Sequence, residues 1–445
     1  MKKLDLCIMA LAMSIAMSAA TRSVEEAAYL ATQFASRQSL QSHMRRAPRK
    51  ATDMQLAHLV SKPGSNEAAI YIFNQADNGG FVIVSADDNA VTILGYSDKG
   101  AFDSNHIPSN VQFWLDYQAE RVAKAKPIDN GIRRAPHEQK ETTPIAPLLG
   151  KIEWGQEFPY NALCPIDMLD GTRCYSGCLA TAVAQMMRYW QWPEQGIGSH
   201  KYKWYNCTSK KQNGDCQQYH DTILSADFSA TTYDWDNMLK QYKGKETDAQ
   251  NHAVAELMYH IGVASDMEYG GRKAKGSSGK VPEMFSAFIR HFAYKKTAKR
   301  MWMDEKTTYE DIAYALKEDL HAGRPIFVTG YGDGYDYQLG HVFVCDGIDA
   351  NDLFHFNWGW EGSYNGYYAL TALDPMRHST EEGSGFSAFI ECFIGIEPEY
   401  DLGDINESMD AVQTGQSEIQ KIIEDGQVII VRGKNKFSVL GQKIQ

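Results

Sequence analysis

The chain has 445 residues, of which 43% are hydrophobic and 22% are charged, and its formal net charge is −12. This composition is that of an ordinary globular protein, and the length allows about three domains. The negative charge gives no support to nucleic-acid binding, which would require basic patches interleaved with aromatic residues. No later segment has about 18 consecutive apolar residues, so we expect no membrane span in the mature chain.

The first 20 residues have the pattern of a secretory signal peptide. Two lysines at positions 2 and 3 precede an apolar run over residues 6–17. Small residues at 18–20 then precede the expected cleavage site. An N-terminal helix of a soluble protein is the alternative, but the apolar run lacks amphipathic spacing. The protein is therefore expected to be secreted or displayed at the cell surface.

Eight cysteines are present, and removal of the signal peptide with Cys7 would leave seven, so at least one thiol stays unpaired within a monomer. Cys164 with Cys174, and Cys207 with Cys216, bracket short polar loops. Each pair could close its loop as a disulfide in an oxidising compartment. No C-x-x-C or H-x-x-x-H spacing occurs, so we expect no zinc or other metal site.

Residues 21–125 have the pattern of a compact α+β domain. A capping box formed by Ser23 and Glu26 opens an amphipathic helix that runs to about residue 37. Three β-type runs and a second helix follow, at residues 69–73, 80–85, 90–96 and 111–125.

Residues 126–143 are polar and charged and contain two prolines and a pair of arginines, which is typical of an exposed, cleavable linker. A foldable domain followed by such a linker favours a zymogen, although a simple two-domain secreted protein would show the same pattern.

The block from residue 147 to about 398 is the largest. Helices are expected at 178–190, 248–263, 282–292 and 309–321. Strands are expected at 326–329, 341–345, 353–358 and 367–370, and the region around Cys207 and Cys216 is expected to be rich in loops. Early helices followed by late strands predict an α+β enzyme in which a helical subdomain faces a sheet subdomain across a cleft.

Cys178 stands where a polar turn meets an amphipathic helix that ends at about Trp190. Unpaired N–H groups and the positive end of the dipole at a helix start favour a thiolate. We therefore expect Cys178 to have a lowered pKa and to act as a nucleophile. A disulfide or an inert buried thiol is the alternative in a secreted chain.

A thiol nucleophile requires a base, a partner that orients the base, and donors for the oxyanion. His341 follows a glycine, starts a predicted strand, and could be the base. Asn357 could hydrogen bond to the imidazole and fix its tautomer, with the adjacent Trp358 covering that bond from water. The side-chain amide of Gln156 could join the N–H of Cys178 in an oxyanion hole.

The order Gln156, Cys178, His341 and Asn357, within separate motifs, resembles that of the streptopain-like cysteine peptidases, which have a papain-like fold. The motifs occupy residues 151–161, 177–189, 340–347, 354–360 and 366–370. The resemblance implies that Cys178 is the nucleophile and that His341 is the general base and then the general acid. It implies that Gln156 is an oxyanion-hole donor. It also places Asn357 and Trp358 on the loop that supports the histidine.

The resemblance further implies that the N-terminal block is an inhibitory prodomain removed by proteolysis, often by the enzyme itself. The glycine- and serine-rich segment 270–279 resembles the cleft-lining loop of the family, and a flexible surface loop is its alternative. An apolar substrate side chain is expected one residue before the scissile residue. The expected domains are a signal peptide, a prodomain with its linker, a papain-like peptidase domain and a C-terminal appendage, at 1–20, 21–143, 144–398 and 399–445.

The C-terminal appendage ends in an expected hairpin and looks like the end of a type-IX-secretion sorting domain; a purely structural appendage is the alternative. We expect a secreted cysteine endopeptidase, made as a zymogen, that acts on protein or peptide substrates without a cofactor. Its own prodomain is the expected inhibitor. Two other classes remain: a binding or adhesion protein on a degenerate peptidase scaffold, and an acyl or amide transferase with the same Cys–His pair.

Overall fold

The computed structural model describes most of the chain between residues 21 and 400 and four short strands near the C-terminus. The described residues are 21–41, 54–125, 142–272, 276–302, 307–330, 341–370, 390–400 and the strands between 419 and 444. The predicted signal peptide, most of the predicted linker and the segment that directly precedes His341 lie outside them. No helix among the described residues has the length and hydrophobicity needed to cross a membrane.

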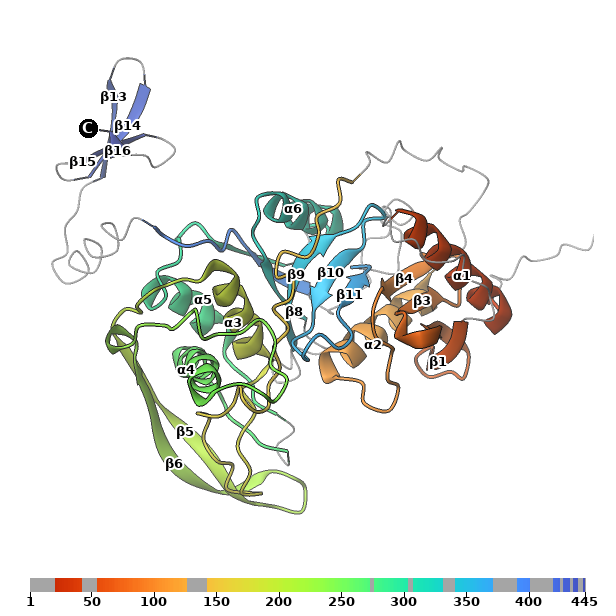
Figure 1. Cartoon of the computed structure of the whole chain (residues 1–445), viewed down its shortest axis with the longest axis horizontal. Coiled ribbons are helices and arrows are strands. Elements are labelled where there is room, and N and C mark those ends of the chain that lie inside the picture. Colours follow the sequence, from red (N-terminus) through yellow and green to blue (C-terminus); the bar gives the residue numbers. More distant parts are fainter. Residues whose placement is uncertain are drawn as a thin grey trace, which may run out of the picture.

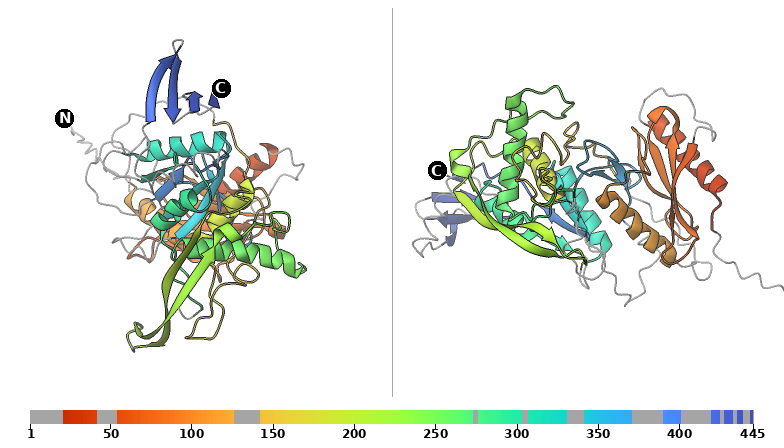
Figure 2. Two further views of the ribbon diagram at one scale, coloured as in Figure 1. Left: turned by 90° about the vertical axis from the view of Figure 1, so that its left-hand side faces the viewer. Right: turned by 90° about the horizontal axis from the view of Figure 1, so that it is seen from below.

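The N-terminal block is a four-stranded antiparallel meander with one helix on each face (Figure 1). Its elements are α1 Val24–Gln41, β1 Met54–Ser61, β2 Ala68–Gln75, β3 Phe81–Ser85, β4 Ile93–Ser97 and α2 Ser109–Lys124. Residues along β2 alternate between the two faces. Ile70 and Ile72 pack in the cluster that contains α2, whereas Tyr71 and Phe73 pack in the cluster of α1. Figure 2 shows the two helices on opposite sides of these strands.

The predicted peptidase block consists of a helical part and a sheet part, as the sequence predicts. The helical part contains α3 Cys178–Trp190, α4 Asp248–Ala264, α5 Val281–Arg290 and the ribbon of β5 Ser199–Lys210 with β6 Cys216–Asp227. The sheet part contains β7 Lys299–Trp302, α6 Tyr309–His321, β8 Ile326–Gly330, β9 His341–Ile348, β10 Phe354–Asn357, β11 Gly366–Tyr368 and β12 Ile390–Ile394. A separate four-stranded sheet follows, formed by β13 Ile419–Glu424, β14 Gln427–Arg432, β15 Asn435–Ser438 and β16 Lys443–Ile444.

One sheet runs through both blocks, in the strand order β1-β2-β3-β4-β11-β10-β9-β8-β12-β7. The junction is the antiparallel pair of β4 and β11, in which Tyr96 lies opposite Tyr367 and Gly95 opposite Tyr368. A side chain at Gly95 would not fit, because its Cβ would lie 2.9 Å from both the Tyr367 carbonyl oxygen and the Tyr368 ring. The N-terminal block is therefore docked by extension of the peptidase sheet.

The long β5–β6 ribbon was not predicted from the sequence, which suggested loops in this region. Its strands do alternate: Trp204 and Asn206 are buried, whereas Lys203 and Tyr205 are exposed. The polar, lysine-containing outer face obscures this alternation in the sequence. The strands β1, β7 and β12 were also not predicted.

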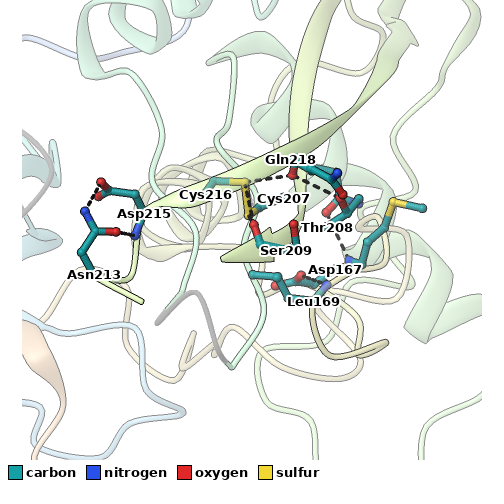
Figure 3. Close-up of a disulfide and its surroundings, with 11 residues drawn as sticks. Asp167, Leu169, Cys207, Thr208, Ser209, Asn213, Asp215, Cys216 and Gln218 are labelled. Carbon is teal, nitrogen blue, oxygen red and sulfur yellow. Dashed lines mark hydrogen bonds between the residues drawn. A yellow bond between two sulfur atoms is a disulfide. The ribbon is translucent and has the colours of Figure 1, made fainter. Parts of the chain in front are cut away.

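The tip of this ribbon is closed by a disulfide between Cys207 and Cys216, whose Cα atoms lie 5.8 Å apart (Figure 3). This expected pairing is confirmed. The other expected pairing is wrong, since Cys164 and Cys174 are both free and buried. The two cysteines lie beside a short antiparallel bridge between Ile166 and Arg173, and burial raises the pKa of both thiols.

The disulfide is expected to stabilise only the tip of the ribbon. Replacing Cys207 and Cys216 by serine should cost about 3 kcal/mol at most, because the closed loop is short. Trypsin should then cut faster at the exposed Lys210 and Lys211, while the thermal unfolding of the peptidase core stays nearly unchanged. Peptide mapping after limited digestion measures the effect, and equal cutting of the wild-type protein and the double variant would contradict it.

Candidate active site

Helix α3 begins at a glycine that no other residue could easily replace. Gly177 precedes the helix with φ 87° and ψ 150°, a backbone conformation that side chains disfavour. A Cβ at this position would also lie 3.1 Å from the carbonyl oxygen of Ser277. Cys178 follows as the first helical residue, partly buried and with a free thiol. The local sequence therefore presents one cysteine at a helix N-terminus with no side chain capping it.

The Cys178 sulfur of the helical part lies at the start of strand β9, which belongs to the sheet part. The backbone N–H groups of Cys178, Leu179 and Val342 lie close enough to this sulfur to favour its thiolate form. Val342 is the second residue of β9 and directly follows His341. The structure thus places the predicted nucleophile next to the residue that follows the predicted base, although the two segments are far apart in the sequence and belong to different subdomains.

The expected lowered pKa of Cys178 is wrong for this form of the protein. Burial raises the pKa of the thiol and outweighs the three N–H groups that favour the thiolate. Burial also lowers the pKa of His341 to about 4. Burial disfavours the charged form of each group, so both shifts favour a thiol and a neutral imidazole at neutral pH.

Helix α2 of the N-terminal block covers His341. The hydroxyl oxygen of Ser109 lies 3.5 Å from Nδ1 of the imidazole, and the ring of Phe113 lies 6.2 Å from the imidazole centroid. Phe113 also packs directly on Gly330, where a Cβ would lie 2.6 Å from the phenyl ring. These α2 side chains occupy the space in front of the predicted base.

Asn110 of the same helix holds the loop that follows β10. Its side-chain nitrogen donates to the carbonyl oxygen of Trp358 at 2.8 Å. Its side-chain oxygen accepts from Nε1 of Trp360 at 2.9 Å. Sequence reasoning missed Ser109, Asn110 and Phe113, because nothing in their local pattern distinguishes them from other residues of an amphipathic helix.

Asn357 is buried and makes three hydrogen bonds to other partners. Its nitrogen donates to the carbonyl oxygen of Ile152 at 2.9 Å, and its oxygen accepts from Gln185 Nε2 at 3.3 Å and from the N–H of Gly359 at 3.1 Å. Within the described residues, the expected bond between Asn357 and His341 is not formed. In this form Asn357 ties strand β10 to helix α3.

Trp358 is fully buried and packs on three aromatic rings. The rings of Phe343, Phe356 and Tyr368 lie 4.6, 5.4 and 5.2 Å from its own. Trp358 therefore anchors the loop after β10 to the sheet beside His341, and in this form it covers no bond between His341 and Asn357.

Gln156 lies beside the first turn of α3. Its carbonyl oxygen accepts a hydrogen bond from the N–H of Ser176 at 3.0 Å, two residues before Cys178. The preceding carbonyl, that of Gly155, accepts from the Thr181 hydroxyl on α3 at 3.1 Å. The Gln156 residue itself is 7% exposed. These bonds fix the backbone of Gln156 against the turn that leads into α3.

The described residues contain no group of three or more His, Cys, Asp or Glu side chains that could hold a metal ion. The predicted site residues Cys178, His341 and Gln156 supply a thiol, an imidazole and an amide donor.

Comparison with known proteins assigns both blocks. Residues 154–368 match the peptidase C10 family, and residues 19–122 match the Spi protease inhibitor family. The thiol protease/hemagglutinin PrtT of Porphyromonas gingivalis is 33% identical over 353 residues, which are 75% of this chain and 37% of PrtT. Streptopain of Streptococcus pyogenes is 31% identical over 345 residues, which are 75% of this chain and 81% of streptopain.

A solved structure has the same architecture. A fragment of prointerpain A from Prevotella intermedia, a cysteine-to-alanine mutant, matches with a TM-score of 0.59 and 31% identity, covering 78% of this chain and 99% of that chain. The fold and the comparisons define a cysteine peptidase, a hydrolase, preceded by a prodomain of the inhibitor type. The chain belongs to the peptidase C10 family, together with streptopain. The predicted α+β, papain-like fold with an N-terminal prodomain is confirmed.

The raised pKa of Cys178 predicts slow alkylation of the precursor. At neutral pH the thiol should react poorly with iodoacetamide, and the rate should rise only at a pH higher than that at which an ordinary cysteine ionises, because the thiolate is the reactive form. Mass spectrometry of the labelled Cys178 peptide, on protein whose intact mass shows the prodomain still attached, measures the rate. Fast alkylation that is already constant below neutral pH would contradict the neutral pair.

Proposed function

We propose that this chain is a secreted cysteine endopeptidase made as a zymogen, with Cys178 as nucleophile and His341 as its general base and acid. The observation that carries the proposal is the Cys178 sulfur at the start of α3, turned towards the first residues of β9. Membership of the C10 family supports it. The pattern of the first 20 residues supports secretion.

The proposed reaction uses only protein groups and water. His341 takes the thiol proton, and the sulfur of Cys178 attacks the peptide carbonyl carbon. The N–H of Cys178 and the side chain of Gln156 stabilise the resulting oxyanion. His341 then protonates the leaving amine. A water molecule, deprotonated by His341, hydrolyses the thioester and restores the thiol.

The prodomain supports latency in two ways. Ser109 and Phe113 cover the imidazole, and Asn110 binds the Trp358 loop beside it. The partial burial of Cys178 and His341 also favours the neutral pair, whereas catalysis needs a thiolate next to an imidazolium. Departure of α2 would admit water and substrate together. We place self-processing in the linker, between about Arg133 and Pro147, and we propose 21–143, 144–398 and 399–445 as prodomain with linker, peptidase domain and appendage.

Replacing the nucleophile tests the assignment directly. The Cys178→Ala variant should lose at least about a thousandfold of its activity on casein-like substrates, because the remaining groups cannot form the thioester. It should also resist trapping by epoxide inhibitors and remain full length unless an active protease is added. His341→Ala should behave likewise.

A matched control is Cys345→Ala, which removes another free cysteine, buried in β9, and should keep activity. Self-cleavage by the Cys178→Ala precursor would contradict the proposal. Transfer of the acyl group to added amines in preference to water would identify a transferase. A wild-type protein that neither cleaves substrate nor is trapped by the inhibitor would point to a binding protein on a peptidase scaffold.

Acid is expected to loosen the prodomain through His341. An imidazole in water has a pKa of about 6.5, whereas burial under α2 lowers the pKa of His341 to about 4. The closed form therefore binds fewer protons than the open form between these values. Its stabilisation by neutral His341 is complete above pH of about 6.5 and is lost as the pH falls towards about 4.

Amide hydrogen exchange of α2 measures this effect in the inactive Cys178→Ala precursor. After correction for the intrinsic pH dependence of exchange, protection of 109–124 should fall between neutral pH and about pH 5. The double variant Cys178→Ala with His341→Gln, which cannot gain this proton, should show a smaller fall. Equal falls in both proteins would contradict the role of the histidine.

A further inference from the structure

A buried carboxylate lies close in the chain to the proposed active-site residue Gln156. Glu153, three residues before Gln156, is only 8% exposed. One of its carboxylate oxygens accepts from Gln241, and the other pairs with the ammonium group of Lys99. Among the described residues, Lys99 is the only cation paired with Glu153. The lysine belongs to the prodomain, whereas the glutamate belongs to the peptidase.

A buried carboxylate is costly unless a cation or several hydrogen bonds compensate it. In this protein the compensating cation leaves with the prodomain. The Lys99 side chain is itself 54% exposed, so it reaches the carboxylate from the solvent side. After maturation Glu153 would keep the neutral donor Gln241 and would lie at the opening that the lysine had filled.

We call the Glu153 carboxylate, together with the space that the Lys99 ammonium group fills, the Glu153 pocket. This pocket lies at the same end of the sheet as His341. Strand β9 starts at His341, and its antiparallel neighbour β10 ends at Asn357, so the loop from 358 to 365 belongs to that end. Gly362 of this loop covers the carboxylate, since a Cβ there would lie 2.6 Å from it. Two strand spacings, about 10 Å, separate β9 from β11. An extended peptide spans that distance in about three residues.

The prodomain segment that carries Lys99 binds as an extended chain. Strand β4 pairs with β11, and the N–H of Ala369 donates to the carbonyl oxygen of Leu94 at 2.8 Å. Ser97 then donates to the carbonyl oxygen of Asn365 at 2.8 Å, two residues before the lysine. When the prodomain leaves, the edge of β11 and the Glu153 pocket are freed together, and both suit an extended segment with a basic side chain.

We propose that the mature enzyme uses the Glu153 pocket to bind a lysine or arginine side chain of its protein substrate, about three residues from the scissile bond. In the precursor, Lys99 occupies this pocket as a substrate-like group. The inference rests on the proposed peptidase function, and it adds a basic side chain to the apolar one expected next to the scissile residue.

Peptide substrates that differ at one position test the pocket in the activated wild-type enzyme. The set starts from one peptide sequence that the enzyme cleaves. Each of the four positions on either side of the scissile bond is replaced in turn by lysine, arginine, norleucine or glutamate. At a single position lysine and arginine should raise kcat/KM about tenfold over norleucine, the size expected for a charge-assisted bond in a partly buried site. Glutamate at that position should lower kcat/KM.

Glu153→Gln should remove the advantage of lysine and leave the norleucine peptide within about twofold of its wild-type kcat/KM. The matched control is Glu157→Gln, which removes an exposed carboxylate four residues on and should keep the preference. The proposal is contradicted if the wild-type enzyme cleaves the peptides but prefers a basic residue at no position. It is also contradicted if the preference for lysine persists in the Glu153→Gln variant. If the activated enzyme cleaves none of the peptides, the proposed peptidase function is contradicted instead.

A variant on the prodomain side decides the matter if Glu153→Gln does not fold. In the Lys99→Met precursor the side chain keeps its length but loses its charge, so the prodomain is held less tightly and self-processing should be severalfold faster. The control is Lys124→Met, which removes a lysine that pairs with Glu120 within α2. Processing of Lys99→Met at the rate of the control would overturn the role of the ion pair.

Discussion

The site depends on the contact between the Cys178 sulfur and the first residues of strand β9, which helix α2 covers. It joins the helical and sheet parts of the peptidase at one point and buries an ionisable pair there. The same burial that assembles the pair holds it neutral. Under the proposed mechanism, latency is an electrostatic state as well as a blocked entrance, since the thiolate and imidazolium proposed for catalysis are disfavoured while α2 is bound.

The sheet gives the prodomain a second hold on the enzyme. Strand β4 adds to the edge of β11, while α2 crosses behind it and donates from Trp114 and Gln118 to the carbonyl oxygen of Ala369. Because edge strands tend to pair with other chains, the prodomain also protects an edge that maturation exposes. The Lys99–Glu153 ion pair lies at this junction, so release of one domain changes the sheet edge, the buried carboxylate and the histidine together.

The sequence predicted what is local to one segment. The Gly177–Cys178 helix start and the strand that begins at His341 follow from spacing and turn residues, and the structure shows both. The raised pKa of Cys178 could not be predicted, because it arises from burial between segments far apart in the chain. Ser109 and His341, for example, are 232 residues apart. Asn357 was predicted from its position in the chain to bind His341, but its observed partners Ile152 and Gln185 are set by tertiary packing.

The packing of α2 also bears on how latency ends. Val111, Trp114 and Leu115 share one hydrophobic cluster with Phe356 and Tyr368 of the peptidase, and the Trp114 and Tyr368 rings meet edge to face at 4.9 Å. Cutting the linker removes none of these contacts. It only ends the high effective concentration that a covalent tether provides. A cleaved prodomain can therefore remain bound and inhibitory, and activity that persists requires the prodomain to unfold, to be digested or to lose its ionic contacts as well.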